Sequence, residues 1–219
     1  GNCALALDAL QQGLAHLPEG PSPLRSNALS NLSVVHYLSG HMQESQRFIE
    51  EALEISQELD DDFETASNLI NLGILKYSGG DWQAAILDFQ RALTIADSLG
   101  SLSLRVSVSI NLGAAYSNLG VDQAAGYHLN RALELARKGS LHLMEALALF
   151  RLAELFNRQG ETAKADETLA AAEALAKEKE DKSQLAAIYS LWAENALAEG
   201  CIPQAQAHIE QSLSLAEEL

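Results

Sequence analysis

Apolar residues recur three and four positions apart through most of the chain, in stretches separated by short glycine-containing turns. This spacing is typical of amphipathic helices, and no stretch alternates as a strand would. Residues 64–78 and 82–98, for example, are predicted to form two helices joined by the turn Gly79-Gly80-Asp81. Glycine can end the first helix at positive φ, and Asp81 can accept hydrogen bonds from the free amides of the second. The sequence therefore predicts an all-α protein.

The helical pattern repeats every 40 residues. A fixed period of this length is typical of stacked helix pairs. Small residues recur in the second helix of each repeat, at Ser45 and then at alanine, and large apolar residues recur beside them. We therefore expect antiparallel helix pairs that stack into a solenoid. The period is marked by Gly40, Gly80, Gly120, Gly160 and Gly200, and the alanines are Ala85, Ala125, Ala165 and Ala205.

Small residues inside the helices have a packing interpretation. Gly73 and Ala85 would let the two helices of one repeat approach closely, and Gly113 would do the same one repeat later. Gly126 has no evident packing reason. At the start of the helix near residue 122, where valine replaces the capping aspartate, we expect Asp122 to act as the cap.

The repeats predict one solenoid domain over residues 1–219. Residues 1–17 form a partial repeat that contains only a second helix, and three prolines between residues 18 and 23 separate it from the rest. Five complete repeats follow. Both ends lack a polar capping helix, so we expect the domain to be excised from a longer protein. The complete repeats are residues 22–60, 61–100, 101–140, 141–180 and 181–219.

Composition excludes several function classes. The chain has 14 basic and 30 acidic residues and a net charge of −16, which disfavours nucleic acid and anionic membranes as partners. It has no apolar run long enough to cross a membrane and no signal peptide. Cys3 and Cys201 lie far apart, which fits a reducing compartment, and we expect a cytoplasmic protein. The six histidines are scattered, and no cofactor, metal or catalytic motif is evident.

The repeats resemble the tetratricopeptide repeat. The resemblance is strongest in Asn71-Leu72-Gly73, Gly80-Asp81-Trp82, Ala84-Ala85 and Arg91-Ala92-Leu93. The 40-residue period departs from the usual 34 residues. In this respect the chain is similar to the subgroup found in kinesin light chains, spindle-orientation adaptors and the maltose-regulon activator. The resemblance implies a right-handed superhelix whose first helices line a concave, peptide-binding face, with no catalytic residue.

Three asparagines precede the Leu-small dipeptide of successive repeats, at Asn31, Asn71 and Asn111. A carboxamide both donates and accepts hydrogen bonds, which suits it to bind the backbone of an extended peptide. These residues look similar to the asparagines that hold peptide backbones in kinesin-light-chain-type arrays. Alternatively, they bond the neighbouring helix and fix the stacking. The other residues that we expect on the peptide-binding face near them are Tyr37, Ile74, Tyr77 and Asn118.

The fourth repeat places Arg151 where asparagine stands in the others, with Arg158 seven residues further on. Both lie on one helix face and could grip an acidic group of the ligand. The alternative is a local salt bridge of these arginines to Glu154.

These features favour a non-enzymatic scaffold that captures a peptide or partner segment, neutral to basic in charge, within a larger regulatory or adaptor protein. The alternative is a small-ligand-sensing domain of a bacterial signal-transducing transcription regulator, which would need an aromatic pocket near Phe150, Phe156 and Trp192. A third hypothesis is self-association through uncapped ends.

Overall fold

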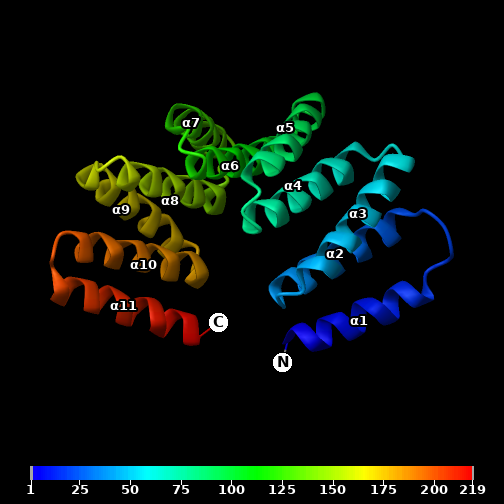
Figure 1. Ribbon diagram of the computed structural model, residues 1–219, viewed down its shortest axis with the longest axis horizontal. Coiled ribbons are helices and arrows are strands. Elements are labelled where there is room, and N and C mark those ends of the chain that lie inside the picture. Colours follow the sequence, from blue (N-terminus) through cyan, green and yellow to red (C-terminus); the bar gives the residue numbers. More distant parts are fainter. Residues whose placement is uncertain (1, 219) are drawn as a thin grey trace. The chain divides into compact units, whose positions relative to one another are not determined.

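The computed structural model describes residues 2–218, which form eleven α-helices and no strand (Figure 1). The all-α prediction is confirmed. Consecutive helices pack in pairs, as the contacts of α2 with α3, α4 with α5, α8 with α9 and α10 with α11 demonstrate. The helices are α1 Asn2–His16, α2 Pro23–Leu38, α3 Met42–Glu58, α4 Asp62–Ser78, α5 Trp82–Ser98, α6 Leu102–Asn118, α7 Asp122–Lys138, α8 His142–Arg158, α9 Thr162–Glu178, α10 Lys182–Ala198 and α11 Ile202–Glu217.

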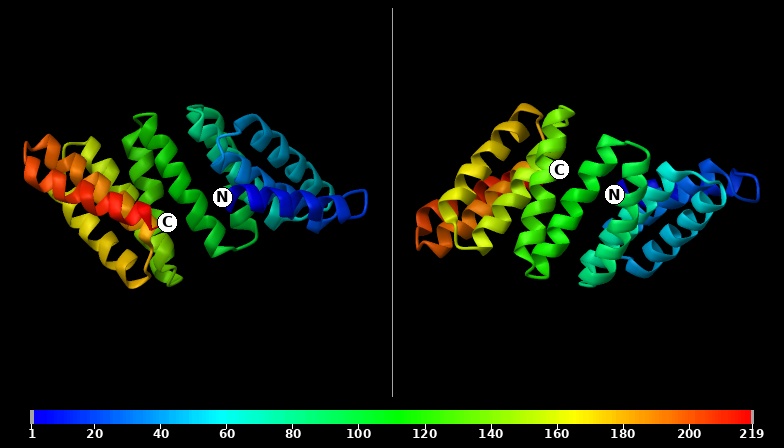
Figure 2. Two further views of the ribbon diagram at one scale, coloured as in Figure 1. Left: turned by 90° about the horizontal axis from the view of Figure 1, so that it is seen from below. Right: turned by 90° about the horizontal axis from the view of Figure 1, so that it is seen from above.

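Contacts divide the chain into two compact units, Gly1–Asn111 and Leu112–Leu219, and the division falls inside α6. We call them unit 1 and unit 2 and describe each by itself. Within each unit the helices stack side by side (Figure 2). The organisation of residues 1–219 as a single domain stays a prediction. Among the described residues, no helix combines the length and the apolar character needed to cross a membrane.

Side-chain caps at the helix starts come from aspartate and, at α2, from Ser22, whose hydroxyl accepts from the Arg25 amide at 3.2 Å. The Asp81 carboxylate accepts from the Ala84 amide at 3.0 Å, and Asp61 and Asp181 cap α4 and α10 in the same way. The expectation for Asp122 is wrong. It is the first residue inside α7, after Val121, which provides no side-chain cap.

Two turn positions of the repeat require a left-handed backbone. The first holds glycine in every repeat, with Gly80 at φ +84°. The second joins one complete repeat to the next, and of these four junctions only one has glycine, Gly100. Side chains rarely adopt this conformation, so the others carry a local cost of about 1 kcal/mol each. These non-glycine residues are Asp60, Ser140 and Glu180, with φ of 52°, 52° and 54°.

The small residues hold the two helices of each repeat close together. A methyl group at Gly73 would overlap the Phe89 ring, and one at Gly113 would overlap the Leu129 side chain. Ala85 and its equivalents are fully or almost fully buried. Their interpretation as spacers is therefore supported by the packing. At Gly126 the nearest atom would lie 3.7 Å from an added methyl group, and nothing in the structure requires glycine there.

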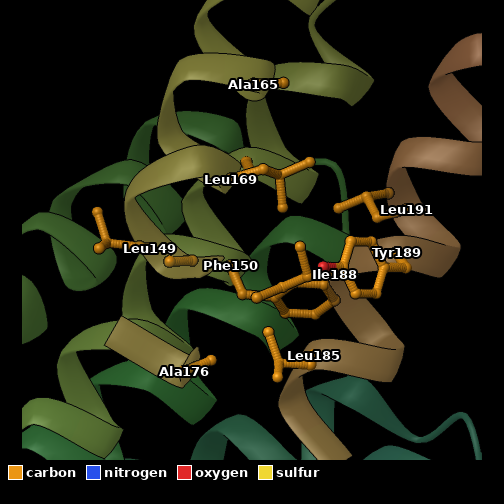
Figure 3. Close-up of a cluster of buried hydrophobic side chains, with 11 residues drawn as sticks. Leu149, Phe150, Ala165, Leu169, Ala176, Leu185, Ile188, Tyr189 and Leu191 are labelled. Atoms are coloured by element: carbon orange, nitrogen blue, oxygen red, sulfur yellow. The ribbon is translucent and has the colours of Figure 1, made fainter. Parts of the chain in front are cut away.

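The core of unit 2 is built by α8, α9 and α10. Figure 3 shows Phe150, Leu169 and Ile188 converging on a common interior. Phe156 and Trp192 are partly buried against the same cluster. The aromatic side chains that a small-ligand pocket would need are thus packed against the core of this unit.

Candidate functional site

The first helices of successive repeats lie beside each other, α2 with α4 in unit 1 and α8 with α10 in unit 2. Each of these helix pairs borders a pocket. The pocket in unit 1, which we call the unit 1 groove, has a volume of about 200 Å³. The corresponding unit 2 groove has a volume of about 350 Å³. The unit 1 groove is lined by Ser33, Val34, Tyr37, Leu38, Ser45, Asn71, Ile74 and Leu75. The unit 2 groove is lined by Glu154, Asn157, Thr162, Leu191, Glu194, Asn195 and Ala198.

The unit 1 groove brings together three of the residues singled out from the sequence, namely Tyr37, Asn71 and Ile74. The Tyr37 hydroxyl bonds the Ser78 hydroxyl at 2.8 Å, which joins α2 to the end of α4. The remaining wall is mostly aliphatic. The groove therefore offers an uncharged, largely apolar surface to which one carboxamide, one phenol and two serines contribute polar groups.

The three asparagines of the series differ in their surroundings. Asn31 is exposed, and it does not line the unit 1 groove. The half-buried Asn71 donates through Nδ2 to the Ser30 hydroxyl at 3.3 Å, a bond to the neighbouring repeat. Asn111 donates to the Ser107 carbonyl of its own helix at 3.0 Å. The Asn71 bond is the kind that the stacking interpretation requires. Tyr77 is half-buried on α4, outside the lining of the groove.

The two arginines of α8 have separate partners in unit 2. Arg151 Nη1 donates to Glu154 Oε2 at 2.8 Å, and its guanidinium lies 5.6 Å from the centroid of the Phe150 ring. Arg158 Nη2 donates to Asn118 Oδ1 at 3.3 Å. This bond joins α8 to α6 through two residues that the sequence predicted for the peptide-binding face. The ion pair of Arg151 is the local salt bridge that the alternative interpretation predicts.

The unit 2 groove consists mainly of residues that the sequence analysis did not single out. Asn157 Nδ2 donates to Asn195 Oδ1 at 2.5 Å, and Asn195 Nδ2 donates to the Asp166 carboxylate at 3.1 Å. Glu154 and Glu194 stand at equivalent positions of the fourth and fifth repeats. The signal was present in the sequence, because the 40-residue alignment places both carboxylates where Val34 and Ile74 stand in unit 1.

Each of the first three repeats joins its two helices through a contact at the same pair of positions, twelve residues apart, which we call the closing pair. In the first repeat His36 stacks on Phe48 with ring centroids 5.2 Å apart. In the second, Lys76 Nζ lies 2.5 Å from the Asp88 carboxylate. In the third, Tyr116 stacks on His128 at 5.5 Å.

Burial sets the protonation behaviour of both histidines in these pairs. It lowers the pKa of His36, with a further lowering from neighbouring His41 and Arg47 against an opposing effect of Glu44. Burial also lowers the pKa of His128, and nearby Arg131 adds to it. Both side chains are therefore stabilised in the neutral, stacked form.

Unit 1 also contains a buried polar cluster that the sequence pattern did not predict. Asn68 is fully buried and donates to the hydroxyls of Ser26 and Ser56 at 3.4 and 3.3 Å, so it links α4 to α2 and α3. Other repeats place alanine, valine or isoleucine at this position. Over the residues that the structure describes, no three histidine, cysteine or carboxylate side chains are grouped as metal ligands would be.

The paired helices, the spacers and the grooves between first helices define a helical repeat array. Residues 24–98 match the family model described as tetratricopeptide repeat, and residues 123–198 match that described as anaphase-promoting complex subunit 5. Residues 24–98 therefore carry the tetratricopeptide repeat, and the helical fold of the described residues is that of a tetratricopeptide-like repeat array. Its sequence matches none of the curated proteins with which it was compared.

Solved structures agree with this fold. A Rap protein complexed with competence and sporulation factor has a TM-score of 0.84 at 19% identity, over 96% of this chain and 58% of that one. A Rap conjugation gene regulator of plasmid pLS20 in complex with the Phr* peptide has a TM-score of 0.71 at 16% identity, over 99% and 68%. Repeats of a putative kinesin light chain from Podospora anserina have a TM-score of 0.64 at 19% identity, over 82% and 89%.

Proposed function

We propose that this chain is a non-enzymatic binding module that holds an extended segment of a protein partner against its first helices. The observation that carries the proposal is the unit 1 groove, where the aliphatic side chains of Val34, Ile74 and Leu75 adjoin Asn71 and Tyr37. An apolar pocket with a few polar groups suits one apolar side chain of a peptide, whose backbone amides the polar groups can bond.

The likeness to Rap proteins supports the proposal, because one of these is described in complex with a peptide. At that level of identity the likeness concerns the fold, so the transfer of peptide binding to this chain is part of the proposal. The net charge of −16 favours neutral to basic partner segments, and the cytoplasm is the compartment we propose. The packed aromatic core of unit 2 favours a peptide over a small molecule as the ligand.

The test is a selection of random dodecapeptides, displayed on phage, against the purified chain. The same selection is run with an Asn71→Ala/Ile74→Ala variant and with Leu87→Ala. Leu87 is a matched control, since it is an exposed apolar residue of α5 outside the unit 1 groove. All variants are used at a temperature at which circular dichroism finds them folded.

We expect the original chain and the Leu87→Ala variant to enrich the same peptides, with an apolar residue at a common position. The groove variant should lose that preference. Failure of the original chain to enrich any peptide would contradict peptide binding. Equal enrichment by the groove variant would place the binding site elsewhere.

A further inference from the structure

We infer that the unit 2 groove binds a cationic side chain, lysine or arginine, of a partner segment. The inference rests on the proposed function, since it specifies the chemistry that one part of the binding face selects. The lining of this groove contains two carboxylates, those of Glu154 and Glu194, and no cationic residue. Its volume of about 350 Å³ accommodates a long side chain.

Local neutralisation of the groove is incomplete. Arg151 pairs with Glu154 through Oε2, so one negative charge of the lining remains when this ion pair is counted. Glu194 is exposed on α10 and contributes that charge. A cation placed between the two first helices would therefore lie beside the Glu194 carboxylate, whose charge Arg151 does not compensate.

The carboxamides of the groove favour the same ligand. Asn195 is 8% exposed, and its two ends are engaged by Asn157 and Asp166. This chain of hydrogen bonds ends on the Asp166 carboxylate and uses the Nδ2 donor of Asn157. It does not use Asn157 Oδ1, which is an acceptor. The groove thus combines carboxylate and carbonyl acceptors, and ammonium and guanidinium groups are donors only.

The equivalent positions of unit 1 indicate that helix stacking does not require these charges. Val34 and Ile74 occupy the positions of Glu154 and Glu194, and α2 still packs against α4. Two like charges on adjacent helices cost free energy unless a cation lies near both. A cationic ligand supplies the favourable interaction that stacking alone does not.

The experiment compares the dodecapeptides selected by the original chain with those selected by Glu154→Gln/Glu194→Gln. The control variant Glu167→Gln/Glu217→Gln removes the same number of charges from exposed helix positions outside the groove. An enriched peptide is then synthesised with each lysine or arginine in turn replaced, lysine by norleucine and arginine by citrulline. Its affinity for each chain is measured by fluorescence anisotropy.

We expect one basic position in the peptides enriched by the original chain and by the control variant, and none in those enriched by Glu154→Gln/Glu194→Gln. Neutralising this residue should weaken peptide binding about tenfold to the original chain and less than about twofold to Glu154→Gln/Glu194→Gln. The second effect is smaller because that variant has no groove carboxylate with which the basic residue could pair. Enriched peptides without a basic position, or an equal loss with both chains, would overturn this inference and leave peptide binding intact. The absence of any enriched peptide would overturn both proposals.

Discussion

The two grooves occupy equivalent places in the repeat, three 40-residue periods apart, but differ in chemistry. Val34, Ile74 and Leu75 in unit 1 correspond to Glu154, Glu194 and Asn195 in unit 2. Around both grooves the small spacer residues, Ser45 in unit 1 and Ala165 in unit 2, remain buried at the same position. The comparison teaches that the spacer positions inside a helix pair are restricted to small side chains, whereas the positions between first helices vary in size and charge and can specialise.

The closing pairs are positions inside the helix pair at which the chemistry of the contact differs between repeats. His36–Phe48, Lys76–Asp88 and Tyr116–His128 join the same two helix positions by stacking, by an ion pair and by stacking again. The geometry of the helix pair admits each of them, because each brings two side chains of compatible size and polarity together.

Enlarging a spacer should have the largest effect and should be equal in the two units. Leucine in place of Ala85 in unit 1, or Ala125 in unit 2, has no room between the paired helices, and we expect a loss of about 3 kcal/mol from overpacking. Urea denaturation followed by circular dichroism measures it. A variant as stable as the original chain would refute the role of these alanines as spacers. A loss of stability from only one of the two substitutions would restrict that role to its unit.

Removing the cation of the second closing pair should cost less. In Lys76→Met the Asp88 carboxylate, whose side chain is 6% exposed, retains only Arg91 at 3.5 Å. We expect a loss of about 2 kcal/mol, below the value for fully buried pairs because Lys76 is partly exposed. The double variant Lys76→Met/Asp88→Leu should recover most of this loss in the same urea titration. No recovery would mean that the lysine stabilises the pair by packing alone.

The third closing pair should make unit 2 sensitive to acid. Because the pKa of His128 is lowered below its ordinary value of 6.5, the unfolded chain takes up the proton more readily than the folded one. The stabilising contribution of neutral His128 is complete above that value and is lost as the pH falls below it. Phenylalanine keeps the stacking on Tyr116 but does not titrate. Between about pH 7.5 and about pH 5.5, the original chain should lose more of its melting temperature than His128→Phe. An equal loss would exclude His128 as a source of the sensitivity.

Exchanging groove chemistry should have the smallest effect on stability. In Val34→Glu/Ile74→Glu the two carboxylates replace an exposed and a half-buried side chain, so we expect a loss of no more than about 1 kcal/mol. The peptides selected by this variant should gain a basic residue where the original chain prefers an apolar one. An unchanged preference would mean that the unit 1 groove does not contact the peptide.

The sequence alone determined the class of the fold and the places of the helices. The 40-residue period, the spacing of apolar residues and the turn Gly79-Gly80-Asp81 predict α4 and α5 close to their observed bounds. They could do so because helix formation, caps and close approach depend on local sequence and on the size of single side chains. The spacer role of Gly73 follows from the same local argument.

Only the tertiary structure decided which polar residues meet across helices. The sequence placed Asn31, Asn71 and Asn111 in one series, yet Asn71 bonds the preceding repeat and Asn111 its own helix. The Asn157–Asn195–Asp166 chain and the ion pair of Arg151 with Glu154 likewise depend on side-chain rotamers and on the packing of neighbouring helices. A repeat period specifies which positions face one another, but long polar side chains choose among several partners within reach, and their surroundings in three dimensions determine that choice.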